Sequence, residues 1–284
     1  MENLHGIKTV DRDFIQVEGE DAKSFLQSQC SQDIEKIDEK NLSLILNPNG
    51  KVVSLLRISK FKDGYLLDLD RGAFDVVNDR LKKFKIRVKV SIQKANFNVL
   101  RSSDLTLLME LRERLQLNEF LVVPFRWNEY EAFDLFFEGE IDSKFAEFSA
   151  FDRISIGFPR FGNEIDESTI AQEIPGLVEN CVSFTKGCYT GQELVARVDS
   201  RGSNVRKLLT SFEVKKSLPY SVLPGSKIKL SDTKQFEITS FTATDDQGGI
   251  GMGFMPRGVN FHVLPEKLLI NDEIEVFVKF SPFS

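Results

Sequence analysis

The sequence of 284 residues contains few of the residues that bind metal ions. It has three cysteines, Cys30, Cys181 and Cys188, two histidines, His5 and His262, and no CxxC pair. Structural zinc sites need four such ligands, usually in closely spaced pairs, so the sequence predicts no metal site. An odd number of cysteines also favours reduced thiols over a disulfide framework, and each cysteine is therefore judged by its neighbours.

Long apolar runs are also absent. No stretch reaches the ~18 apolar residues of a membrane-spanning helix, and the first residues lack the basic start and apolar core of a secretory signal. We therefore expect a cytoplasmic protein with no membrane partner. The formal net charge is −6, which argues against general binding of nucleic acid but does not exclude a local basic patch. No direct nucleic-acid partner is predicted.

Hydrophobic residues make up 41% of the chain and charged residues 28%, as in ordinary folded domains. Through the first 140 residues, strand-like patterns at 14–17, 42–46, 51–59, 65–69, 87–92 and 133–137 alternate with helix-like patterns at 22–29, 73–84 and 105–114. Beyond residue 206, short apolar runs are separated by turn residues, at 207–214, 226–230, 236–242, 250–254 and 274–280. These patterns predict an α+β protein that ends in a small β-barrel or sandwich.

One segment, K-G-C-Y-T-G-Q-E at residues 186–193, has the features of a binding or reactive site. Thr190 and Glu193 have the spacing of a capping box, so a helix is expected to begin here. Cys188 would then lie just before the helix. Unpaired N–H groups at the helix start and the charge of Lys186 would favour a thiolate at that position.

The two glycines of this segment, Gly187 and Gly191, would let the backbone bend sharply or approach a ligand closely. A structural interpretation is equally compatible with the sequence, because junctions between a loop and a helix often contain glycine, lysine and a buried cysteine. Cys181 lies in an apolar run and Cys30 on the first predicted helix, and we predict that both belong to the core.

The segment from Lys186 to Glu193 resembles the K-G-C-[YF]-x-G-Q-E signature of the YgfZ family. These proteins are folate-binding relatives of the glycine-cleavage T-protein, and their eukaryotic counterparts are mitochondrial iron–sulfur assembly factors. Further segments are similar to motifs of the same superfamily: Gly19–Gln27 (G-x-D-A-x-x-F-L-Q), Pro48–Val52 (P-x-G-K-V), Arg153–Gly157 (R-x-E-A-G) and Phe161–Asp166 (Y-G-N-D-I-D).

The resemblance implies a T-protein-like fold, in which two α/β lobes and a C-terminal β-barrel surround a central, folate-sized hole. It places the folate-binding region at residues 1–205, with the second lobe at roughly 48–125, and the barrel at 206–284. The implied cofactor is tetrahydrofolate or a one-carbon derivative of it. The implied clients are iron–sulfur proteins.

The same resemblance suggests roles for individual residues. Cys188 and Lys186 form the expected reactive pair, with Gly187 and Gly191 as the motif glycines. The expected cofactor-binding residues are Glu173, Tyr189, Gln192 and Arg197. An ion pair with Glu193, four residues earlier on the predicted helix, explains Arg197 equally well.

Two positions differ from the true aminomethyltransferases. The glutamate of their R-x-E-A-G motif contacts the pterin, and Ser155 occupies that place here. Their catalytic aspartate has Asp75 as its nearest counterpart, although a solvated carboxylate on a helix explains Asp75 as well.

These differences favour a tetrahydrofolate-binding accessory protein that supports assembly or repair of iron–sulfur proteins. The alternatives are a folate-dependent aminomethyltransferase or demethylase, and a scaffold that has lost the folate.

Overall fold

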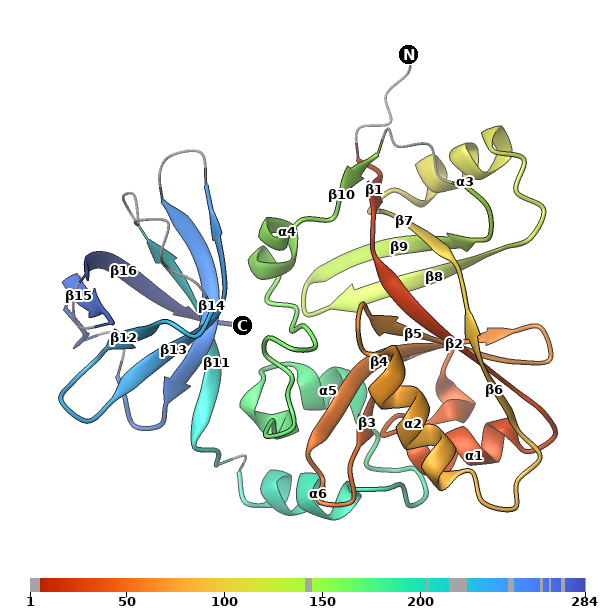
Figure 1. Ribbon diagram of the computed structural model, residues 1–284, viewed down its shortest axis with the longest axis horizontal. Coiled ribbons are helices and arrows are strands. Elements are labelled where there is room, and N and C mark those ends of the chain that lie inside the picture. The colour runs from red at the N-terminus through yellow and green to blue at the C-terminus, as the bar shows by residue number, and fades with distance from the viewer. Residues whose placement is uncertain are drawn as a thin grey trace. The chain divides into compact units, whose positions relative to one another are not determined.

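The computed structural model describes residues 6–140, 145–202, 204–214, 224–244, 248–260, 263–265, 267–271 and 274–283, so His5 and His262 lie outside the described residues. The chain divides into two compact units (Figure 1). The first unit contains Met1–Phe148 and Glu179–Gln192, and the second contains Ser149–Val178 and Glu193–Ser284. Among the described helices, none has the length and apolar character needed to cross a membrane.

The first unit contains two five-stranded sheets (Figure 1). One is antiparallel, with its strands in the order β3 (Leu42–Leu46), β4 (Val52–Phe61), β5 (Gly64–Asp70), β2 (Arg12–Glu18) and β6 (Ser91–Ala95). Its helices are α1 (Ala22–Gln29), the short η1 (Ile34–Lys36) and α2 (Phe74–Phe84). Helix α2 packs on β2, β4 and β6, with Val77 and Leu81, one helical turn apart, fully buried.

The second sheet has the strand order β10 (Ala146–Glu147), β1 (Lys8–Thr9), β7 (Asn98–Ser102), β9 (Tyr130–Phe137) and β8 (Phe120–Trp127). Helix α3 (Leu105–Arg114) contributes Leu108 and Leu111 to a core that includes Leu135 of β9. The side chain of Asp104 accepts hydrogen bonds from the N–H groups of Thr106 and Leu107 and so caps the start of α3.

A buried ion network joins the two sheets of the first unit. Arg57 of β4 donates to Asp68 of β5 at 2.6 Å and to Asp134 of β9 at 2.5 Å, and Arg101 of β7 donates to Asp134 at 2.7 Å. Burial favours the neutral form of Asp134, but the two guanidinium groups outweigh this effect and lower its pKa to about 2. Arg12 of β2 adds a further ion pair with Asp68.

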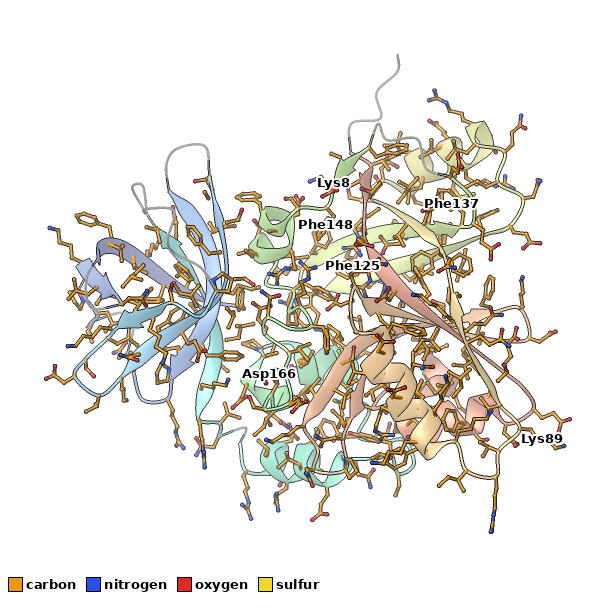
Figure 2. The ribbon with its side chains drawn as sticks, in the orientation of Figure 1. Lys8, Lys89, Phe125, Phe137, Phe148 and Asp166 are labelled. Carbon is orange, nitrogen blue, oxygen red and sulfur yellow. The ribbon has the colours of Figure 1, made fainter. Side chains whose placement is uncertain are left out.

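Aromatic rings pack around this network. The Arg101 guanidinium lies 3.7 Å from the ring centroid of Phe125 and 4.7 Å from that of Phe148, and these two residues appear close together in Figure 2. Apolar side chains from both sheets, including Phe14 and Phe136, complete the core beside the charges. Paired charges and aromatic rings thus fix one sheet to the other.

The second unit ends in a closed six-stranded barrel. Its strands follow the order β11 (Lys207–Val214), β14 (Gly249–Pro256), β13 (Gln235–Ala243), β12 (Lys227–Lys229), β15 (Lys267–Ile270) and β16 (Ile274–Pro282), which pairs back with β11. Gly251 and Gly253 of β14 make room for the rings of Phe212 and Phe236, because an added Cβ would lie 2.4 and 2.5 Å from them. The helices outside the barrel are α4 (Ala150–Ser155), η2 (Ala171–Glu173) and most of α6 (Gln192–Ser200), while α5 (Leu177–Cys181) spans the boundary between the units.

The predicted α+β class, the predicted helices and the C-terminal barrel are confirmed. The strand predicted at 87–92 is wrong, because β6 begins only at Ser91. Arg87 has a φ of +55°, a left-handed conformation that interrupts an extended chain. The predicted domain bounds stay a prediction.

Candidate functional site

The motif segment forms a loop that runs from the end of α5 to the start of α6 and belongs, up to Gln192, to the first unit. Cys188 is exposed on this loop. Cys30 and Cys181 are buried, as predicted, and burial raises the pKa of Cys30 to about 12 and that of Cys181 well above its ordinary value. Cys188 is therefore the accessible thiol among the three cysteines.

Lys186 fixes this loop to the end of α1. Its ammonium group donates to the carbonyl oxygens of Gln27 and Cys30, each at 2.7 Å, and of Gln32 at 2.9 Å. A helix leaves its last carbonyl groups unpaired, and a cation is favoured there by the helix dipole. The three bonds engage all three N–H donors of the ammonium. Burial lowers the pKa of Lys186 to about 8.

Two further main-chain bonds attach the loop to the same region. The N–H of Thr190 donates to the carbonyl of Ser28 at 3.1 Å, and the N–H of Ser183 donates to the carbonyl of Ser31 at 3.0 Å. Helix α6 begins at Gln192, so Thr190 lies before the N-cap position. The predicted capping box of Thr190 and Glu193 is therefore wrong, because α1 takes the Thr190 amide.

Tyr189 and Gln192, two of the expected cofactor-binding residues, contact the loop itself. The Gln192 side chain accepts a hydrogen bond from the N–H of Tyr189 at 3.2 Å. The ring centroid of Tyr189 lies 5.2 Å from the Lys186 ammonium, and burial raises the pKa of Tyr189 to about 12. In the structure both residues therefore help to shape the loop, and their contact with a cofactor stays a prediction.

The two motif glycines have different surroundings. Gly191 has a φ of +84°, and an added Cβ would lie 2.5 Å from the carbonyl oxygen of Asn47 and 2.8 Å from Cβ of Leu46. Only glycine fits against this turn between β3 and β4. An added Cβ at Gly187 would meet no atom of the described residues within 4 Å, and its backbone is not left-handed. Packing explains Gly191, whereas no contact among the described residues explains Gly187.

The other expected site residues lie elsewhere. Glu173 is buried in η2 of the second unit, where its carboxylate accepts the N–H of Ile170 at 3.2 Å. Arg197 is exposed on the part of α6 that belongs to the second unit. Ser155 is exposed at the end of α4, and Asp75 is exposed in the first turn of α2. Six of the expected site residues therefore lie together on the loop of the first unit: Lys186, Gly187, Cys188, Tyr189, Gly191 and Gln192. The other two, Glu173 and Arg197, belong to the second unit.

Sequence reasoning missed Arg80 of α2, which lies beside the same end of α1. Its guanidinium donates to the carbonyl of Leu46 and to the side chain of Gln29, each at 3.0 Å, and stacks 3.6 Å from the ring centroid of Phe84. Burial lowers the pKa of Arg80. The sequence does contain a signal for Arg80, because it lies next to the apolar stripe of α2, where a charged residue is unusual.

The role of the Arg153 and Phe161–Asp166 motifs was also missed. Glu164, only 1% exposed, accepts from Arg153 at 3.0 Å, from Thr239 of β13 at 2.7 Å and from Ser240 at 2.6 Å. These motif residues therefore attach their segment to the barrel within the second unit. Across the described residues, no group of three or more His, Cys, Asp or Glu side chains is arranged to hold a metal ion.

Comparison with known proteins finds relatives in sequence. The chain is 28% identical over 213 residues to the tRNA-modifying protein YgfZ of Vibrio vulnificus (strain CMCP6), a match that spans 68% of this chain and 65% of that protein. It is 30% identical over 228 residues to the tRNA-modifying protein YgfZ of Enterobacter sp. (strain 638), covering 68% of this chain and 67% of that protein. No protein-family model matches the chain.

The fold also has a relative among solved structures. The glycine cleavage system aminomethyltransferase T from Bartonella henselae matches 96% of this chain and 84% of its own, with a TM-score of 0.76. The two sequences are 15% identical, so this likeness establishes a shared fold. The predicted T-protein-like fold is thereby confirmed.

Proposed function

Because this chain belongs to the YgfZ family, we propose that it is a tetrahydrofolate-binding accessory protein that supports iron–sulfur proteins through the thiol of Cys188. One observation carries the proposal: Cys188 is exposed on a loop whose backbone is fixed to α1 by Lys186 and Thr190. A thiol that is accessible and held in one place suits reaction with a ligand or partner. The name of the relatives favours clients that modify tRNA.

In this proposal Lys186 acts as a positioning residue, since its ammonium is engaged by three carbonyl groups. The residues expected to hold the folate fit it chemically. A buried carboxylate such as Glu173 suits the N–H groups of a pterin, and an exposed guanidinium such as Arg197 suits the carboxylates of the glutamate tail. Bound tetrahydrofolate would supply a carrier for a one-carbon unit.

Calorimetric titration with tetrahydrofolate tests the binding half of the proposal. We expect saturable binding to the wild type and weaker binding to Glu173→Gln and Arg197→Ala. Arg126→Ala, which changes an exposed arginine of β8, is the matched control and should bind as the wild type does. Absence of binding to the wild type, with no shift of its melting temperature at saturating ligand, would support the scaffold that has lost the folate.

Alkylation of the folded protein tests the thiol. We expect one rapidly modified cysteine in the wild type and none in Cys188→Ser, because Cys30 and Cys181 are buried. In a strain that lacks its own relative of this protein, the gene should restore tRNA modification and Cys188→Ala should not. Full activity of Cys188→Ala would contradict a role for the thiol.

The shared fold with an aminomethyltransferase favours a second candidate, a folate-dependent aminomethyltransferase or demethylase. In that case Asp75, exposed at the start of α2, would be the catalytic carboxylate. Formation of methylene- or methyltetrahydrofolate by the purified protein, lost in Asp75→Asn, would favour this enzyme over the accessory protein. We expect no turnover, since Ser155 stands where the transferases have their pterin-binding glutamate.

A further inference from the structure

The last turn of α2 and the residues that connect it to β6 are strongly basic, although the chain as a whole is acidic. Residues 82–89, here named the basic segment, contain Lys82, Lys83, Lys85, Arg87 and Lys89 and no carboxylate. Subtracting these five positive charges from the chain's −6 leaves −11 for all other residues. All five side chains are exposed. The expectation of no nucleic-acid partner rested on the total charge, which conceals this separation.

The fold holds the basic segment in a defined conformation. Its neighbours on either side, Leu81 and Val90, are buried. The main chain of Lys89 is bonded to Asp21 in both directions: its N–H donates to the Asp21 carboxylate at 2.7 Å, and its carbonyl accepts the Asp21 N–H at 3.4 Å. Arg87 has a φ of +55°, which is unfavourable for a residue with a side chain. The main chain of the basic segment is therefore anchored on both sides, at Leu81 and at Lys89.

Local structure accounts for only some of these charges. Lys82 and Lys83 lie in the last turn of α2, where cations stabilise the helix dipole. Lys89 pairs with Glu20 at 2.6 Å, but about three quarters of each side chain is exposed, so the pair contributes little. Lys85 and Arg87 lie beyond the helix and form no ion pair with any residue that the structure describes.

We propose that the basic segment binds single-stranded RNA. Lysine binds phosphate groups as a point charge and is depleted from protein–protein interfaces, and four of the five cations are lysines. Ile86, 69% exposed between Lys85 and Arg87, offers an apolar contact to a base, which a single strand presents and a duplex hides. Lys89 projects away from the ribbon at this edge of the unit (Figure 2).

Fluorescence anisotropy with a labelled poly(U) oligonucleotide tests this proposal in the full-length protein. The variant Lys83→Gln/Lys85→Gln/Arg87→Gln removes three charges from the segment. The control Lys36→Gln/Lys227→Gln/Lys279→Gln removes three exposed charges elsewhere. We expect the segment variant to bind at least about tenfold more weakly and to lose about 2 from the slope of log K against log salt, while the control stays within about twofold. Ile86→Ser should weaken binding with the slope unchanged.

Three results would overturn the proposal: no binding of poly(U) to the wild type at low salt, equal weakening by both triple variants, or tighter binding of another polyanion. The competitors are duplex DNA, phosphatidylserine vesicles and poly-glutamate. Tighter binding of vesicles or poly-glutamate would assign the segment to a membrane or to an acidic protein. Melting temperatures equal to that of the wild type show that the variants fold, and unchanged alkylation of Cys188 separates this test from the tests of the thiol.

Discussion

Two regions of the first unit bind cationic side chains in different ways. Between the sheets, Arg57 and Arg101 face the carboxylates of Asp68 and Asp134. At the end of α1, Lys186 donates only to carbonyl oxygens. A buried ion pair is expensive to break because the remaining charge has no partner, whereas bonds to neutral carbonyl groups leave no charge behind when the cation is removed. We therefore expect a larger loss of stability from breaking the first region, whereas the second attaches the loop that carries Cys188 to the end of α1.

The largest expected effect comes from removing one charge of the network. Asp134→Asn leaves Arg57 and Arg101 without their shared carboxylate, so the free energy of unfolding should fall by about 3–5 kcal/mol. Chemical denaturation measures it. Asp38→Asn, which breaks the exposed pair with Lys60, is the control and should cost less than about 1 kcal/mol. If both variants lost the same free energy of unfolding, burial would not explain why the Asp134 network matters more than an exposed ion pair.

Alanine substitutions of the two motif glycines should affect the stability of the loop differently. Gly191→Ala should lower the free energy of unfolding by about 2–3 kcal/mol, because alanine would be strained at a φ of +84° and would overlap the carbonyl of Asn47. Gly187→Ala should leave stability unchanged, since its Cβ would contact none of the residues that the structure describes. If Gly187→Ala nevertheless weakens tetrahydrofolate binding, a ligand approaches the loop there. A stable Gly191→Ala variant would contradict the packing described here.

Lowering the pH should weaken the ion network around Asp134 over a defined pH range. The pKa of Asp134 is lowered from its ordinary value of 3.8 to about 2, so its contribution to stability is present above 3.8 and is lost as the pH falls through about 2. The loss should be about 2 kcal/mol. Denaturation across this range should show a steeper decline for the wild type than for Asp134→Asn. Parallel curves would contradict the assignment.

Lys186→Met should have a smaller effect than Asp134→Asn or Gly191→Ala, about 1–2 kcal/mol at neutral pH, because three hydrogen bonds are lost but no charge is left unpaired. Burial lowers the Lys186 pKa from 10.5 to about 8, so between these values the folded protein binds fewer protons than the unfolded chain. The advantage of the wild type over Lys186→Met should therefore grow as the pH rises from 8 to 10.5.

Lys186→Met should also change the alkylation rate of Cys188 more than Asp134→Asn does. The opposite ranking would show that the loop is positioned by the network and not by its own contacts.

The sequence predicted those features that have a local cause. Helix α2 was predicted because its apolar residues repeat at the spacing that places them on one face of a helix. The barrel strands were predicted because turn residues separate short apolar runs. The partners of Lys186 could not be predicted, because carbonyl groups 159 and 156 positions earlier carry no side-chain signal. The same holds for Arg57 and Asp134, which are 77 positions apart and meet only when the two sheets pack.

The attachment of Lys186 to main-chain oxygens has an evolutionary consequence. Every residue type has a carbonyl group, so mutations at Gln27, Cys30 and Gln32 can accumulate without removing the acceptors of the ammonium group. Natural variation at the helix end should therefore be independent of the lysine, and a search for covarying positions would overlook the contact that holds the thiol in place.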